Sequence, residues 1–227
     1  MPTTQPQKPP NQAGHQTMVG IIRNSTYADD IRVFVKSKRA AQRVLVQATK
    51  VLESDLKLRV NREKSVINPA SVATLLGFGF YFTKTGVKIK ATAKAFKRMK
   101  RRIKELTSRK WSVSMAYRIQ QLNRYVRGWM GYFRLSQTPR KFSDLDEWFR
   151  RRMRQIRWKQ WKRIRTRIAQ LKRLGIRPDR AYQWGMSSRA YWRIAGSPVL
   201  TRALPNQYWV DIGLILFRDA WDRFQRP

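Results

Sequence analysis

The spacing of apolar residues changes once along this 227-residue chain, near residue 90. Before that point apolar side chains alternate in short runs, as at Phe78 and Phe80, which is typical of strands with one apolar face. After it they recur every three or four residues, as at Phe96, Met99 and Ile103, which predicts amphipathic helices. The chain is therefore predicted to be α+β, with a small β-hairpin region followed by a predominantly α-helical region.

Two hairpins and one helix are predicted before residue 90. β-rich sequence flanks the polar stretch Tyr27-Ala28-Asp29-Asp30, and a second apolar hairpin turns at Thr85-Gly86. Ser37 is expected to cap a helix that runs to about residue 56. Residues 58–60 are predicted to begin the second β region.

The remaining chain is predicted to be a series of helices. The first starts near Ala91, the second is capped by Ser114, and the third is capped by Ser143 and runs to Gly175. Three acidic residues near the start of the third helix favour its N-terminal dipole, namely Asp144, Asp146 and Glu147. A further short helix is expected to start at Pro178. Three aromatic residues of the second helix are predicted to be core, namely Trp129, Tyr132 and Phe133.

These patterns divide the chain into four segments. Residues 1–17, rich in Pro, Gln and Thr and including His15, are predicted to be a disordered lead, with structure beginning near Met18. The other segments are residues 18–90, residues 91–138 and a basic helical region of residues 139–227, with a connector near Thr138-Pro139.

The charge of the chain bounds its partners. Lys and Arg number 50 against 13 Asp and Glu, a net charge of +37, while 42% of residues are apolar. Such self-repulsion destabilises a compact state unless a polyanion neutralises it, so DNA or RNA is the expected partner. An anionic membrane surface is the rival, but polybasic membrane anchors are short and this charge spans the chain, so no membrane partner is predicted.

Several other classes are excluded or disfavoured by composition. The chain has no cysteine, which excludes disulfides and cysteine-bound zinc. No apolar run reaches the length of a membrane span, and the N-terminus lacks the pattern of a signal peptide. A cytoplasmic protein is therefore expected.

Two stretches in which nearly all charged residues are Lys or Arg are the candidate nucleic-acid contacts. Residues 94–110 hold nine basic residues and one acid, and residues 150–177 hold thirteen basic residues and no acid. A solvated helix face is the alternative, but such faces usually mix signs to form i,i+4 pairs. The candidates, including two arginines between these stretches, are Lys97, Arg98, Arg101, Arg102, Arg124, Arg127, Arg150, Arg151, Arg154, Arg157, Lys159, Lys162, Arg163, Arg165 and Arg167.

Trp158 and Trp161 interrupt the second basic stretch, three residues apart. They could stack on nucleic-acid bases. Burial against Trp184 or Trp192 is the favoured interpretation.

Asp29 and Asp30 form an adjacent acidic pair at the tip of the first predicted hairpin. Hairpin turns favour Asn-Gly or Asp-Gly, because glycine adopts positive φ, so two carboxylates serve the turn less well. A divalent cation would relieve their repulsion, and phosphoryl transfer often uses two such cations. Most such pairs are solvated turn residues, and that alternative stays open.

Several blocks resemble, in order, the group II intron-encoded reverse transcriptase/maturase family. Tyr27-Ala28-Asp29-Asp30 resembles its Y-A-D-D box, residues 36–44 its palm helix, and residues 56–65 the next conserved block. Leu76-Gly77-Phe78 resembles the primer-grip hairpin, residues 124–133 the maturase-specific thumb (domain X), and residues 157–162 and 191–195 the DNA-binding region of members without an endonuclease. The likeness extends from Tyr27 to Trp209.

The resemblance implies a bacterial-type protein that binds group II intron RNA, assists its splicing and copies it into target DNA. Asp29 would be a Mg²⁺ ligand and Asp30 its neighbour in the catalytic turn. Tyr27 would lie near the incoming nucleotide and Lys64 near its phosphates, while Leu76, Gly77 and Phe78 would hold the primer end. Residues 18–90 would be a palm remnant and residues 91–138 the thumb/maturase helices.

The sequence departs from the family before the Y-A-D-D box. The family's third carboxylate and basic fingers precede that box, and here only 26 residues do, without an Asp or Glu. We therefore expect a truncated protein with an incomplete catalytic site, which has lost RNA-directed DNA polymerase activity in isolation and does not bind Mg²⁺ productively alone. The alternatives are half of a split enzyme that needs a second chain, a non-enzymatic basic RNA- or DNA-binding protein, and the product of a decayed gene.

Overall fold

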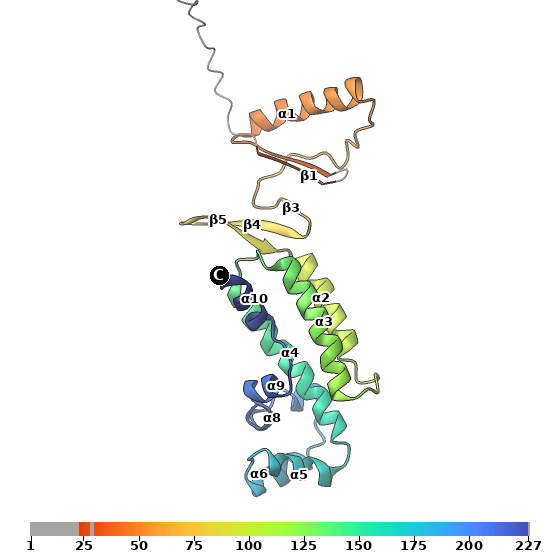
Figure 1. Cartoon of the computed structure of the whole chain (residues 1–227), viewed down its shortest axis with the longest axis vertical. Coiled ribbons are helices and arrows are strands. Elements are labelled where there is room, and N and C mark those ends of the chain that lie inside the picture. Colours follow the sequence, from red (N-terminus) through yellow and green to blue (C-terminus); the bar gives the residue numbers. More distant parts are fainter. Residues whose placement is uncertain (1–22, 28–29, 227) are drawn as a thin grey trace, which may run out of the picture. The chain divides into compact units, whose positions relative to one another are not determined.

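The computed structural model describes residues 23–27 and 30–226, which form two compact units, Met1–Ala70 and Ser71–Pro227 (Figure 1). The predicted disordered lead, His15 and the start of structure near Met18 lie outside the described residues, as do Ala28 and Asp29. Among the described residues, no helix combines the length and apolar character needed to cross a membrane.

The first unit contains one hairpin and one helix. Strands β1 (Arg23–Tyr27) and β2 (Asp30–Phe34) are antiparallel, with Tyr27 opposite Asp30. Helix α1 (Lys38–Lys50) is capped by the Ser37 hydroxyl, which accepts a hydrogen bond from the Ala40 backbone at 3.2 Å. A π-helical turn, η1 (Val51–Asp55), extends α1. The first hairpin and its following helix are thus confirmed.

The β structure predicted for residues 58–60 is wrong. These residues form no strand, and the chain instead turns. Lys57 has a positive φ of 54°, and the Asn61 side-chain oxygen accepts a hydrogen bond from the Lys64 backbone at 3.1 Å. Such a local bond offers the backbone an alternative to strand pairing.

The second unit begins with a small antiparallel sheet in the order β3-β4-β5. Its strands are β3 (Thr74–Leu75), β4 (Phe78–Thr83) and β5 (Gly86–Ala91). Phe82 pairs with Val87 and Thr83 with Gly86, which confirms the predicted second hairpin.

Nine described helices follow the sheet: α2 (Ala93–Leu106), α3 (Met115–Phe133), α4 (Pro139–Gln160), α5 (Ile164–Arg173), α6 (Pro178–Gly185), α7 (Tyr191–Ile194), α8 (Pro198–Ala203), α9 (Asn206–Asp211) and α10 (Phe217–Gln225). Helices α2 and α3 pack side by side, and α10 packs on both α3 and α4 (Figure 1). Met99, Ile103, Leu122, Phe142 and Phe149 are fully buried in the core that these helices share. The predicted α+β class, with helices dominating after residue 90, is confirmed.

The predicted third helix is two helices with a different start. Pro139 occupies the first turn of α4, so Ser143 lies inside the helix, where its hydroxyl donates to the Pro139 carbonyl at 3.4 Å. The helix stops at Gln160, because Trp161 leaves helical geometry and its carbonyl accepts from Arg167 Nε at 3.0 Å. Helix α5 then ends before Gly175, whose φ of +80° suits the predicted C-terminal glycine.

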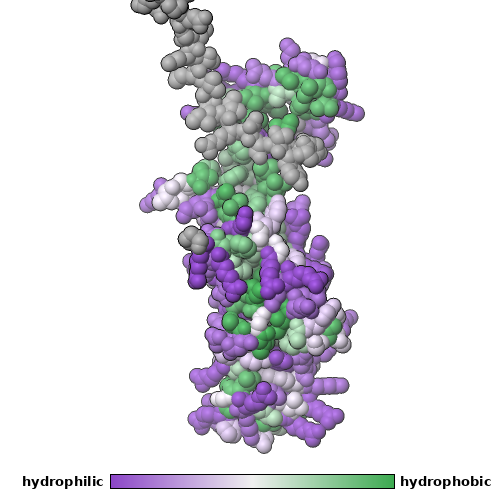
Figure 2. Space-filling view, in the orientation of Figure 1, coloured by the Kyte–Doolittle hydropathy of each residue, from purple (hydrophilic) through white to green (hydrophobic). Residues whose placement is uncertain are grey.

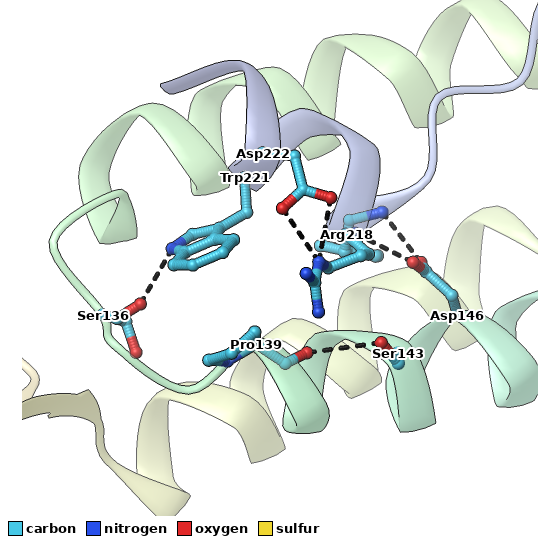
Figure 3. A network of polar contacts seen from close by, with 8 residues as sticks. Ser136, Pro139, Ser143, Asp146, Arg218, Trp221 and Asp222 are labelled. Carbon is cyan, nitrogen blue, oxygen red and sulfur yellow. Dashed lines mark hydrogen bonds and ion pairs between the residues drawn. The ribbon is translucent and has the colours of Figure 1, made fainter. Parts of the chain in front are cut away.

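A polar network fastens α10 to the α3–α4 corner (Figure 3). Both carboxylate oxygens of Asp146 accept backbone N–H groups at the start of α10, from Phe217 and Arg218, each at 2.8 Å. Trp221 Nε1 donates to the Ser136 carbonyl at 2.8 Å. Asp146 therefore caps a helix 71 residues further along rather than serving the dipole of its own helix.

The sheet packs against the end of α3. The Phe78 ring lies 5.6 Å from that of Tyr132 and 5.0 Å from that of Phe133. Phe133 is buried and Trp129 half-buried, but Tyr132 is 51% exposed, so its core prediction is wrong. Its hydroxyl donates to the Leu76 carbonyl at 2.8 Å, which explains why the ring lies at the surface rather than inside.

Candidate nucleic-acid interface

Several basic residues of the second unit hold the fold by donating to backbone carbonyls. Arg118 is buried and donates to the carbonyls of Leu106 and Trp111, at and beyond the C-terminal end of α2. Arg152 donates to the carbonyls of Lys104 and Thr107 at the same end. The last carbonyls of a helix lack partners within it and carry partial negative charge, so these guanidinium groups stabilise the end of α2.

Four of the predicted nucleic-acid contacts have such structural roles. Arg154 is only 8% exposed, and its Nε donates to the Ala195 carbonyl at 2.9 Å. Arg151 donates to the Trp192 carbonyl at 3.0 Å and stacks on that indole at 4.2 Å. Lys159 and Arg167 donate to the carbonyls of Arg109 and Trp161. The burial of Arg154 argues against its predicted role, and we leave it out of the interface.

The other predicted contacts divide into two groups. Arg102 pairs with Glu105 at 2.8 Å, and Arg157 donates to Gln160 at 3.2 Å. Within residues 30–226, no described side-chain hydrogen bond or ion pair engages the remaining nine, which are Lys97, Arg98, Arg101, Arg124, Arg127, Arg150, Lys162, Arg163 and Arg165. Eight of these nine are exposed and Arg150 is half-buried, so they can meet an external counter-charge.

Helix α2 carries three of these nine residues, Lys97, Arg98 and Arg101. Its buried stripe is Ala95, Met99, Ile103 and Leu106, and the opposite face carries basic side chains interrupted by Glu105 alone. Figure 2 shows hydrophilic residues over much of the visible face of the helical unit. A helix face whose charged side chains are nearly all basic forms few ion pairs within the helix. Such a face attracts a polyanion.

A groove of about 450 Å³ lies between α2 and α3. Its lining combines basic, polar and aromatic side chains without an acid: Arg102, Leu106, Gln121, Arg124, Tyr125, Gly128 and Trp129. Burial raises the pKa of the Tyr125 phenol, the nearby positive charges of Arg102 and Arg98 lower it, and the negative charge of Glu105 raises it. The Tyr125 phenol therefore stays neutral in a lining that also contains Arg102 and Arg124.

The predicted catalytic residues lie mostly in the first unit. The backbones of Tyr27 and Asp30 face each other at the end of the hairpin, while Asp29 lies outside the described residues. No cluster of three His, Cys, Asp or Glu occurs among the residues that the structure describes. The Mg²⁺ role of Asp29 and the catalytic role of Asp30 stay predictions, and no step is derived from them.

The predicted nucleotide and primer contacts are placed differently. Lys64 is exposed in the turn after Asn61. Leu76 and Gly77 both have positive φ, 52° and 82°, and turn the chain from β3 into β4, where Phe78 begins the strand. A side chain at Gly77 would lie 3.3 Å from the Phe133 ring, so this turn is packed against α3.

Trp158 and Trp161 are buried, which confirms their predicted burial and argues against base stacking. The described ring contacts of Trp158 are with Trp161 at 5.9 Å and with the guanidinium of Arg167 at 4.8 Å. These partners differ from Trp184 and Trp192, which were predicted.

The fold and the groove define a basic helical domain with an exposed cationic surface. Comparison with known families then narrows the class, because residues 96–175 match the family model described as "Group II intron, maturase-specific domain". Residues 96–175 are therefore similar to that domain, which supports a C-terminal region of a group II intron maturase/reverse transcriptase and a maturase role in group II intron splicing. The match spans most of α2 and all of α3, α4 and α5, and it confirms the family that the sequence blocks indicated. Among curated proteins, no match to the chain was found.

Proposed function

We propose that this protein binds group II intron RNA through the exposed surface of α2 and α3 and thereby assists splicing of that RNA. One observation carries the proposal: the groove that Arg102 and Arg124 line, with Arg98 near its Tyr125, lies within the matched maturase-specific domain. Arginine suits this role because its planar fork binds phosphate oxygens with two parallel hydrogen bonds.

Binding through this surface requires the counter-charge of phosphates. Each phosphate that a basic side chain neutralises releases a condensed cation, so affinity falls as salt rises. Arg98, Arg101 and Arg124 are exposed and make no described side-chain hydrogen bond or ion pair, so their replacement leaves the folded contacts intact.

The test is binding of a group II intron transcript by the full chain over a range of salt concentrations. The triple variant Arg98→Ala/Arg101→Ala/Arg124→Ala is expected to lose affinity at least about tenfold and to flatten the salt slope by about two or three. A matched control of equal net charge is Arg202→Ala/Arg223→Ala/Arg226→Ala, because these three exposed residues lie outside residues 96–175.

Equal losses in the two triple variants would show non-specific charge attraction and contradict the proposed surface. The same variants are then compared in a splicing assay of a precursor transcript that carries a group II intron. The proposal expects the α2–α3 variant to lose stimulation of splicing and the control variant to retain it.

A second candidate function is RNA-directed DNA synthesis on target DNA with a second chain that completes the polymerase site. The observation that favours it is the β1–β2 hairpin, in which Tyr27 and Asp30 flank the two residues of the turn. By the Y-A-D-D resemblance, Asp29 would be a Mg²⁺ ligand. In this candidate, residues 191–195 and the exposed cations of residues 150–177 contact DNA.

A further inference from the structure

Gly128 lies in the middle of α3, where a glycine destabilises a helix relative to alanine. The fold gives no reason for it. A methyl group built at Gly128 meets nothing within 4 Å, in contrast to Gly185, where it would lie 2.5 Å from Ile168 Cγ1. Packing among the described residues therefore explains the glycine at 185 and does not explain the glycine at 128.

The position of Gly128 suggests why a residue without a side chain occurs there. Gly128 lines the α2–α3 groove, between Arg124 one turn before it and the ring of Trp129. A glycine leaves the helix backbone bare at that point of the groove wall. Bare backbone permits the close approach of another backbone, which is a recurrent use of glycine.

The chemistry of the lining indicates the occupant. Arg102 and Arg124 are the charged groups of the lining, while Arg98 lies near Tyr125, as does Glu105, which is paired with Arg102. A phosphodiester strand matches this lining, because its oxygens accept from guanidinium groups and from the Tyr125 hydroxyl while its sugars lie against apolar surface. An acidic peptide would match the charge, but the exposed face of α2, which is basic except for Glu105, favours a continuous polyanion.

We propose that Gly128 is the point of closest approach between this protein and the sugar–phosphate backbone of its RNA, seated in the α2–α3 groove. This inference rests on the proposed RNA binding. It adds that the RNA strand lies in the α2–α3 groove and that any side chain at residue 128 obstructs the strand. Gly128 is thus a steric determinant of binding, distinct from the arginines that supply charge.

Gly131 offers a matched control on the same helix. A methyl group there also meets nothing within 4 Å, but Gly131 does not line the groove. Gly128→Ala and Gly131→Ala are each expected to raise the melting temperature of the full chain by about 2–4 °C, because alanine favours the helix. Gly128→Ala is expected to weaken binding of a group II intron transcript at least about fivefold, and Gly131→Ala to leave it within about twofold.

A substitution that stabilises the protein while weakening its binding cannot act through misfolding. If the wild-type chain binds the transcript and Gly128→Ala binds equally well, this inference is wrong while the proposed function stands. Equal weakening by both variants would overturn the assignment to the groove. If the wild-type chain binds no intron RNA, the proposed function itself fails.

Duplex DNA and an acidic polypeptide, poly-glutamate, serve as parallel probes. Loss of DNA binding in Gly128→Ala to the same extent would assign the groove to phosphodiester backbones in general, which retains the steric role of Gly128. Tight binding of poly-glutamate that Gly128→Ala abolishes, with RNA binding unchanged, would overturn the assignment to RNA.

Discussion

At the scale of single residues, Asp146 carries the most unusual environment of any described carboxylate. It is only 2% exposed, and both its oxygens accept backbone N–H groups from α10. Burial raises the pKa of Asp146 from 3.8 to about 6, an effect larger than the opposing ones of its two hydrogen bonds and of Arg150. The carboxyl group thus holds its proton more tightly in the folded chain than in the unfolded chain.

This shift predicts how stability depends on pH. The pKa of Asp146 is higher in the folded chain than in the unfolded chain. Its contribution to the free energy of unfolding is therefore greatest below about pH 3.8 and is lost as pH rises through about 6. Asp146→Asn removes the titration, so the free energy of unfolding of wild type minus that of Asp146→Asn is expected to fall between pH 4 and 7. The fall is at most about 3 kcal/mol, since one pKa unit corresponds to about 1.4 kcal/mol.

Urea unfolding at each pH measures this difference. The exposed Asp144→Asn variant removes the same charge from the same helix and serves as the control. A difference that stays constant from pH 4 to 7 would show that Asp146 is equally acidic in both states.

At the scale of elements, the C-terminal end of α2 depends on arginines from other helices. Arg118 of α3 reaches the carbonyls of Leu106 and Trp111, and its guanidinium stacks on the Trp111 ring at 4.8 Å. Arg118→Lys keeps the charge but cannot reproduce the planar fork. We expect a loss of about 1–2 kcal/mol in the free energy of unfolding, because a buried carbonyl loses its partner.

The control for this substitution is Arg124→Lys on the same helix. Arg124 is exposed and makes no described side-chain hydrogen bond, so a change within about 0.5 kcal/mol is expected. Denaturant unfolding of both variants decides, and equal stabilities would contradict the structural role of Arg118.

The elements also show which parts of the fold local sequence can predict. Ser37 and Ser114 cap their helices through bonds to residues three positions on, so a short window of sequence contains the whole interaction. The end of α4 at Gln160 was missed, because it depends on the burial of Trp158 and Trp161 by distant helices. The link from Asp146 to Phe217 joins residues 71 positions apart, beyond any local pattern.

The candidate site was predictable in composition but not in detail. The run of cations in residues 94–110 indicated the exposed face of α2 correctly. The same reasoning could not separate Arg154, which binds a carbonyl, from Arg98, which is exposed, because both are arginines in basic runs. The α2–α3 groove was not predicted, although a glycine inside an apolar helical pattern, as at Gly128, is the one signal that could have indicated it.

At the scale of the whole molecule, the two units carry different parts of the family resemblance. The first contains the Y-A-D-D hairpin and the second contains the matched maturase-specific domain. The family's third carboxylate precedes the Y-A-D-D box, and residues 1–26 contain no Asp or Glu. By the resemblance, we expect two metal ions held by this hairpin alone to lack a ligand.

Primer extension with Mg²⁺ on an RNA template tests this division. The chain alone is expected to give no product. A mixture with a second chain that supplies the N-terminal polymerase half is expected to give product only if the split-enzyme candidate is correct, and Asp29→Asn should then abolish it. Extension by the chain alone would show that the site is complete without the third carboxylate.

The arginine–carbonyl contacts at the ends of α2 and α7 have a consequence for how this sequence can evolve. A carboxylate partner can be lost by a single codon change, but every residue type that replaces Lys104, Leu106 or Ala195 still presents a backbone carbonyl. The accepting carbonyl of each contact is therefore kept whatever side chain a mutation introduces. Lineages of this protein can exchange surface acids for bases, and so retune their affinity for a polyanion, without dismantling the contacts that hold their helices together.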